Sequence, residues 1–132
     1  MRRWVAVGAL FLALAPAAAL TKTANLFGVW GGPHAGIAFQ GGLADVQFDC
    51  ASGTIDVPVY PAKDGAFTAR GTFRAGEPGP VRVGQIFRSE PANYSGHVVK
   101  NLMTLTITLD DGTAVGPFAL TQGVAPQLTR CL

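Results

Sequence analysis

The residue types that could carry chemistry in this 132-residue chain are few and widely spaced. Cys50 and Cys131 are the only cysteines, so they allow a single intramolecular disulfide. A redox or nucleophilic thiol is the alternative, but the chain has no C-x-x-C spacing and no obvious base beside either cysteine. A disulfide persists in an oxidising compartment. The cysteines therefore predict one structural disulfide that joins distant parts of the chain.

Trp30, His34 and Tyr94 are the candidates for contact with a ligand. His34 follows the Gly31-Gly32-Pro33 turn directly after Trp30, and glycines permit a close approach of the backbone to a ligand. One interpretation is that Trp30 and His34 line the mouth of a pocket. The other is that Trp30 fills the end of a core and His34 is satisfied within a loop. Tyr94, on a strand-like alternating segment, completes the candidate ligand-binding set.

Catalytic and metal chemistry are not predicted. A zinc site needs three or four ligands at characteristic spacing, and two histidines with two paired cysteines are too few. Asp110-Asp111-Gly112 lacks the calcium-loop pattern and indicates a turn. The chain also lacks a G-x-S-x-G nucleophile motif. We therefore expect no catalytic residues, no metal, no cofactor and no enzymatic activity.

The N-terminal residues have the pattern of an export signal. Arg2-Arg3 precedes an uncharged apolar run over residues 4–14, and Ala17-Ala18-Ala19 matches the A-x-A form that signal peptidase accepts. The apolar run is too short for a stable membrane anchor. The sequence therefore predicts a signal peptide over residues 1–19, a single domain over residues 20–132, and a periplasmic or secreted protein.

The apparent basic character of the chain comes from this signal. Arg2 and Arg3 account for the formal charge of +2, because the remaining Lys and Arg equal Asp and Glu in number. A neutral domain lacks the basic surface typical of nucleic-acid binding, and it lacks the polybasic segment that anionic membranes attract. We expect neither as a partner.

Alternating apolar and polar residues dominate the rest of the chain, a period typical of half-buried strands. The alternating runs cover residues 37–39, 44–50, 55–60, 67–74, 93–98, 103–110 and 118–120. Turn signals separate them at Gly41-Gly42, Lys63-Asp64-Gly65, residues 76–80, Lys100-Asn101 and Asp110-Asp111-Gly112. Pro58, on the polar side of its run, indicates an edge strand or a bulge.

These runs predict an all-β fold, an antiparallel meander of eight to ten short strands. Such a meander must bury its apolar face against itself, and closure into a barrel also removes the strand edges. Short connections favour an up-and-down barrel, while a β-sandwich fits the same alternation.

Gly28-Val29-Trp30 resembles the G-x-W start of lipocalin-like (calycin) barrels. In that superfamily the tryptophan plugs one end of the barrel, and the mouth usually holds a small hydrophobic molecule. Small disulfide-bonded barrels of the secreted inhibitor type open with a similar strand. The first resemblance implies a lipocalin-like barrel with a ligand, and the second implies a protein partner.

A longer resemblance is to a group of small exported bacterial proteins with no assigned activity. It is carried by Trp30-Gly31-Gly32-Pro33-His34, residues 49–56, residues 79–82, Tyr94-Ser95-Gly96, residues 103–109 and Cys131-Leu132. This resemblance implies export and the disulfide in a bacterial periplasmic or extracellular setting, and it implies no function.

Two functions therefore stay open. The first is an exported, monomeric binding module whose barrel holds an apolar or amphipathic small ligand. Small inward residues would leave room for it, namely Ala44, Ala69, Gly71 and Gly96, whereas Phe48, Phe67, Phe73 and Phe118 would fill the interior. The second is a protein-interaction module, such as a periplasmic protease inhibitor or an envelope accessory factor. That module would act through residues 20–25 or the loop at 76–80.

Overall fold

The computed structural model describes residues 26–76, 83–84 and 88–131. The predicted signal peptide, its boundary after Ala19, residues 20–25 and most of the loop at 76–80 lie outside these residues. The described residues form eight β-strands and no helix. None of them, accordingly, belongs to a helix that could cross a membrane.

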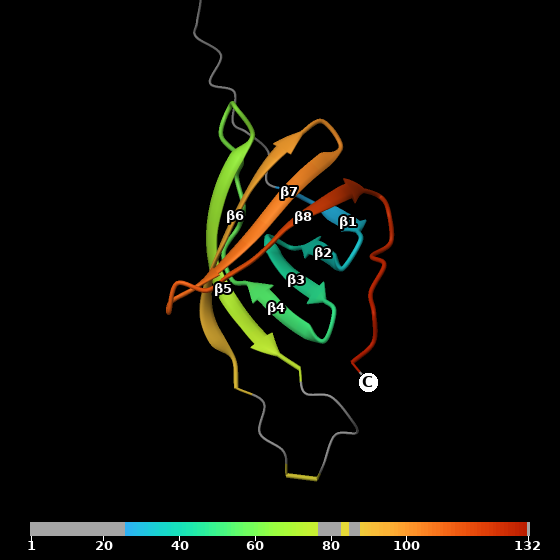
Figure 1. Ribbon diagram of the computed structural model, residues 1–132. Helices are drawn as coiled ribbons and strands as arrows, with labels where there is room; N and C mark the ends of the chain where they lie inside the picture. The colour runs from blue at the N-terminus through green and yellow to red at the C-terminus, as the bar shows by residue number, and fades with distance from the viewer. Residues whose placement is uncertain (1–25, 77–82, 85–87, 132) are drawn as a thin grey trace, which may run out of the picture.

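The eight strands follow one another in simple order around a closed barrel (Figure 1). They are β1 (Gly28–Gly32), β2 (Ala35–Gln40), β3 (Leu43–Phe48), β4 (Ala51–Ile55), β5 (Ala66–Ala75), β6 (Glu90–Val99), β7 (Leu102–Leu109) and β8 (Ala114–Gln122). Each strand pairs antiparallel with the next, and β1 closes the barrel against β8 through the pair Trp30 and Gln122. The predicted up-and-down barrel is confirmed, and the sandwich alternative is not the fold.

The strands form where the sequence alternates. In β7, Met103, Leu105 and Ile107 are buried while Thr104 between them is exposed. Strand β3 repeats this pattern, because Val46 is buried between exposed neighbours. Successive side chains of a strand point to opposite faces, so each alternating run sends its apolar side chains into the barrel.

The tight turns between the strands contain residues at positive φ, most of them glycines. Gly41 and Gly42, at φ 60° and 82°, reverse the chain between β2 and β3. Lys100 has φ 55° in the turn between β6 and β7, and Gly112 has φ 91° between β7 and β8. These three predicted turns are confirmed. Lys63-Asp64-Gly65 also turns, but it leads into β5 from an irregular segment.

The predicted strand over residues 55–60 is wrong, because β4 ends at Ile55 and residues 56–62 form no strand. Pro58 and Pro61 cannot donate to a strand ladder and restrict the residues before them. The segment is nevertheless fixed. The Asp56 N–H donates to the Arg70 carbonyl at 3.2 Å, which protects the free edge of β5.

Cys50 was also expected to continue the alternation of residues 44–48. It lies instead in the turn between β3 and β4, with φ 53°. Strand β3 stops at Phe48, and the Asp49-Cys50 turn carries the chain into β4.

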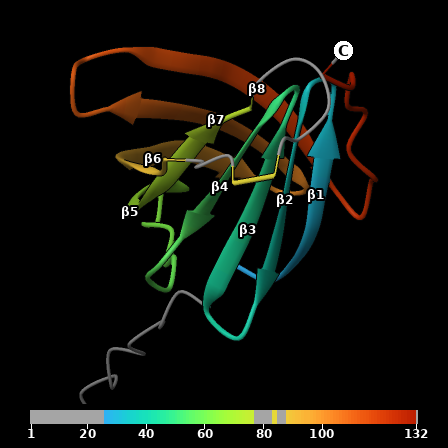
Figure 2. The same ribbon diagram turned by 90° about the horizontal axis from the view of Figure 1, so that it is seen from below.

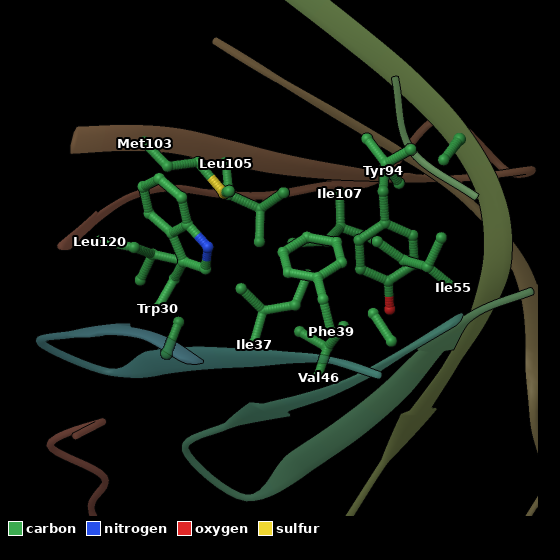
Figure 3. Close-up of a cluster of buried hydrophobic side chains, with 14 of the residues drawn as sticks. Trp30, Ile37, Phe39, Val46, Ile55, Tyr94, Met103, Leu105, Ile107 and Leu120 are labelled. Carbon is green, nitrogen blue, oxygen red and sulfur yellow. The ribbon is translucent and has the colours of Figure 1, made fainter. Parts of the chain in front are cut away.

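A single apolar cluster fills the centre of the barrel, and every strand contributes to it. Figure 3 shows Trp30, Met103 and Leu120 gathered at one side of this cluster, while Tyr94 and Ile55 lie at the other. Among the described residues no polar or charged residue is buried. The interior is therefore built from apolar side chains packed against one another.

The two halves of the barrel differ in strand length. Strands β1–β4 have five or six residues each, whereas β5–β8 have eight to ten. In Figure 2 the short strands form one side and the long strands curve around the other. Strand β5 pairs with β4 only through residues 71–75, so the long strands extend beyond the short ones.

Residues 123–131, which we name the C-terminal strap, run along the outside of β1 and β2 after β8 ends (Figure 1). The Gln127 N–H donates to the Gly32 carbonyl at 3.0 Å, and the Gln127 carbonyl accepts the His34 N–H at 2.8 Å. The strap ends in the predicted disulfide between Cys131 and Cys50, which is confirmed. It thereby joins the end of the chain to the turn between β3 and β4.

Candidate functional site

Trp30 lies inside the barrel and not at a pocket mouth. Its side chain is 2% exposed, and its indole Nε1–H donates to the Phe27 carbonyl at 3.2 Å. The ring packs beside Met103 and Leu120 (Figure 3). This bond satisfies the single polar group of the indole, so Trp30 closes the interior as a fully satisfied core residue.

Tyr94 crosses the interior from β6. It is fully buried, and its hydroxyl donates to the Thr72 carbonyl at 2.6 Å. Gly53 on β4 lies against that hydroxyl, and a Cβ at this position would overlap it. Burial, together with the negative charge of Asp56, raises the pKa of the Tyr94 phenol far above its ordinary value. The phenol therefore stays protonated and serves as a fixed donor within the core.

His34 is the one member of the candidate set that faces solvent. Its side chain is 63% exposed, and its ring nitrogen Nδ1 pairs with Asp49 Oδ2. The other Asp49 oxygen accepts the backbone N–H of Thr129 in the strap at 2.6 Å. That bond, and then the contact with His34, lowers the pKa of Asp49. The His34–Asp49 pair thus links the β1–β2 turn to the β3–β4 turn at the same end of the barrel, and Asp49 ties both to the strap.

The structure does not bring Trp30, His34 and Tyr94 to one surface, because two are buried and one is exposed. Sequence reasoning missed Asp49 and the strap as partners of His34. The only available signal was the position of Asp49 beside Cys50, since the second cysteine lies two residues after Thr129.

Three cavities open on the outer face of the short strands, and they meet at Asp45 on β3. The first has about 220 Å³ and lies beside the strap, between Val29, Ala38 and Pro126. The second, of about 270 Å³, lies toward the β2–β3 turn and includes Asp56. The third, of about 420 Å³, extends over β4 and β5. Asp45 lines all three, and we name them together the outer groove.

Small outward residues explain why the sheet is hollow here. Gly36, Ala38 and Ser52 occupy outward positions on β2 and β4, on either side of β3. Cross-strand neighbours lie close enough for long side chains to cover the backbone between them, and these residues are too short to do so. Asp45 and Gln47 therefore project from the floor of the groove.

The chemistry of the outer groove changes along its length. Its strap end is apolar, with Val29, Ile37 and Pro126 in the lining. Its other end is polar, with Gln47, Ser52, Thr54, Thr72, Arg74 and Ser89. The Thr54 hydroxyl lies 2.8 Å from the Thr72 hydroxyl and donates to Asp56 Oδ1 at 2.8 Å. This arrangement can bind a ligand by hydrogen bonds at one end and by apolar contact at the other.

The long strands present a different outer face. Thr68, Ser95 and Thr106 pair in register across β5, β6 and β7, and His97 pairs with Thr104 in the next row. The side chains of these five residues cover the backbone of the sheet. None of the five lines any of the three cavities. We interpret this face as an ordinary solvated one.

Metal binding has no candidate in the part of the chain that the structure describes, since no three His, Cys, Asp or Glu side chains are grouped there. Comparison with known proteins adds no relative, because no protein-family model, no curated protein and no solved structure matches this chain. The geometry described above is therefore what a functional interpretation must rest on.

Proposed function

We propose that this protein is an exported binding module that acts through the outer face of its short strands, and not through the barrel interior. The observation that carries the proposal is the filled interior: one apolar cluster with side chains from all eight strands occupies it. The three cavities that described residues line around Asp45 lie on the outer face of the barrel. The predicted signal peptide and the disulfide support export.

The small inward residues do not reserve space for a ligand. A Cβ at Gly96 would meet the Phe67 ring at 2.6 Å, so that ring already occupies the available volume. At Gly71 the neighbouring strand itself lies in contact, since a Cβ would overlap the Thr54 carbonyl. The Tyr94 hydroxyl takes the corresponding place at Gly53. These glycines therefore serve close packing, which favours the interaction-module hypothesis over a ligand held in the barrel.

Mass spectrometry tests the interior. The protein is secreted into a bacterial periplasm, purified gently, and compared under native and denaturing conditions. We expect the same monomer mass in both, with cleavage after Ala19 and the loss of two hydrogens at Cys50 and Cys131. An apolar molecule of defined mass retained only under native conditions would support the alternative, a ligand inside the barrel.

Site-specific cross-linking tests the outer face. A photoreactive amino acid is placed at Gln47 in the outer groove or, as the matched control, at Thr106 on the outer face of β7. Both positions are outward on strands, so the two variants should fold equally well. We expect a discrete cross-linked species in producing cells from position 47 only. Equal products from both positions, or none from position 47, would contradict the proposal.

A further inference from the structure

The cavity between Asp45 and Asp56 combines apolar and acidic residues. Ala38 and Leu43, which are exposed on the outer face, line it together with these two carboxylates. No Lys, Arg or His is among its lining residues. Apolar side chains beside two negative charges match a side chain that carries a cation on a methylene stem, as Lys and Arg do.

The charges of this cavity are not used within the described chain. The Asp45 carboxylate has no hydrogen bond or ion pair to any described residue, and Asp56 accepts only the Thr54 hydroxyl. By contrast, Asp49 pairs with His34, and Asp110 pairs with Arg70. The outer groove therefore holds two exposed carboxylates that pair with no described cation, so they are available to a positive group of a binding partner.

The C-terminal strap indicates that the partner is a polypeptide. The strap is a stretch of extended chain held on the adjoining part of the same outer face, where Gly31 and Gly36 lack side chains that would block it. Its Pro126 forms a wall of the apolar cavity, and this cavity meets the acidic one at Ala38 and Asp45. The outer groove thus adjoins the part of the outer face on which the main chain of the strap already lies.

From these features, and resting on the proposed function, we propose that the outer groove binds an extended segment of a partner protein. The segment places a Lys or Arg side chain between Asp45 and Asp56, and it places an apolar side chain in the cavity beside Pro126. The groove thereby selects a basic–apolar segment, and the acidic cavity is the specificity-determining part of the surface.

A peptide titration tests this proposal on the folded, disulfide-bonded protein. The probe is the capped peptide Ac-Leu-Thr-Arg-Thr-NH₂, and its control replaces arginine with citrulline, which keeps the shape and removes the charge. Amide chemical shifts of ¹⁵N-labelled protein should move at Leu43, Asp45 and Thr54. Binding should weaken at least about threefold with citrulline, which is the scale of one exposed ion pair.

Substitutions on the protein side sharpen the test. Asp45→Asn should weaken binding of the arginine peptide by the same factor. Asp110→Asn, in the turn after β7, should leave the binding of this peptide unchanged. Both residues are exposed, so we expect each variant to keep the fold, and its amide spectrum checks this. Equal binding of the citrulline peptide, or an unaffected Asp45→Asn variant, would overturn the cationic assignment.

Two further outcomes separate this inference from the proposed function. If position 47 still cross-links in cells while the arginine peptide fails, the outer face binds a partner of other chemistry and only the cationic assignment falls. If free N-acetylarginine amide binds as tightly as the peptide, the occupant is a small cation and the polypeptide assignment falls. Loss of both cross-linking and peptide binding would remove the proposed function as well.

Discussion

The barrel is made of two halves that are stabilised in different ways. Strands β5–β8 have eight to ten residues each and long antiparallel ladders, of which only the one between β7 and β8 shifts register, between Leu105 and Ile107. Short turns join β6 to β7 and β7 to β8. Strands β1–β4 have only five or six residues each. The short half instead carries the C-terminal strap and the disulfide between Cys50 and Cys131.

This difference explains where a binding surface can form. In the long half, outward Thr, Ser and His side chains cover the sheet in register. In the short half, Gly31 and Gly36 leave space that the strap uses, while Ala38 and Ser52 leave the outer groove open. The short half therefore has both the C-terminal strap and the outer groove on its outer face. Both features follow from small residues on β1, β2 and β4.

Removal of the disulfide tests this comparison most severely. In the chain-entropy model, a cross-link between residues 81 positions apart stabilises the fold by roughly 4.5 kcal/mol. We expect the Cys50→Ser/Cys131→Ser variant to lose about 2–5 kcal/mol of unfolding free energy, measured by urea denaturation. Native-state hydrogen exchange should show the larger loss of protection in β1 and β2.

The long half serves as the internal control in that experiment. Amides of Leu105 and Ile107 lie in ladders far from the strap, so their residual protection should follow global unfolding alone. If β1 and β2 lose no more protection than β7, the strap does not support the short half selectively, and the comparison fails.

A second prediction concerns the contact between the sheet and the strap. A Cβ at Gly36 would overlap the Pro126 ring, so Gly36→Val should displace the strap. We expect a loss of about 1–3 kcal/mol, the usual cost of overpacking, measured by thermal or urea unfolding. Exchange of the Gln127 and Thr129 amides should accelerate.

The matched control is Ala38→Val, two residues further along β2 and also on the outer face. This position is exposed and opens on the outer groove, so the unfolding free energy should change by no more than about 0.5 kcal/mol. Equal losses in the two variants would mean that the strap contact at Pro126 contributes nothing specific.

Much of the long half could be predicted from the sequence, because strong alternation and local turn residues are short-range signals. Strand β7 and the turns at Lys100 and Gly112 are of this kind. Residues 56–60 were wrongly predicted as part of a strand because apolar and polar residues alternate there. Pro58 and Pro61 nevertheless prevent the hydrogen-bonded pairing of a strand in this segment. The disulfide was predictable because two cysteines allow one pairing.

The candidate site was much less predictable. The outer groove depends on which residues become cross-strand neighbours, for example Ala38 with Asp45 and Asp45 with Thr54. The first pair follows from the two-residue turn at Gly41-Gly42, but the open space around Asp45 also depends on β4, β5 and the strap, which lie next to it only in the folded barrel. Trp30 and Tyr94 attracted a ligand hypothesis because aromatic residues serve both cores and binding sites, and only their burial and hydrogen bonds distinguish the two uses.

The smallest predicted effect concerns acid, and it compares two aspartates whose pKa values are both lowered. A bond from the Thr129 N–H lowers the pKa of Asp49 below the ordinary value of 3.8, and the contact with His34 adds to this. A bond from the Thr113 N–H does the same for Asp111. A lowered folded-state pKa contributes stability above the ordinary pKa, and this contribution is lost as the pH falls through the lowered value.

The two carboxylates should nevertheless loosen different structures in acid. Asp49 joins the strap to the turn between β3 and β4, whereas Asp111 holds only its own turn after β7. As the pH falls from about 5 to 2.5, we expect the Thr129 amide to lose protection in the wild type, while an Asp49→Ala variant, which has no side-chain acceptor, is already unprotected at pH 5. Asp111→Ala should leave Thr129 unchanged and affect only the Thr113 amide. If Thr129 keeps its wild-type protection at pH 5 in the Asp49→Ala variant, the strap is held by its disulfide and backbone bonds alone, and His34 and Asp49 have no part in it.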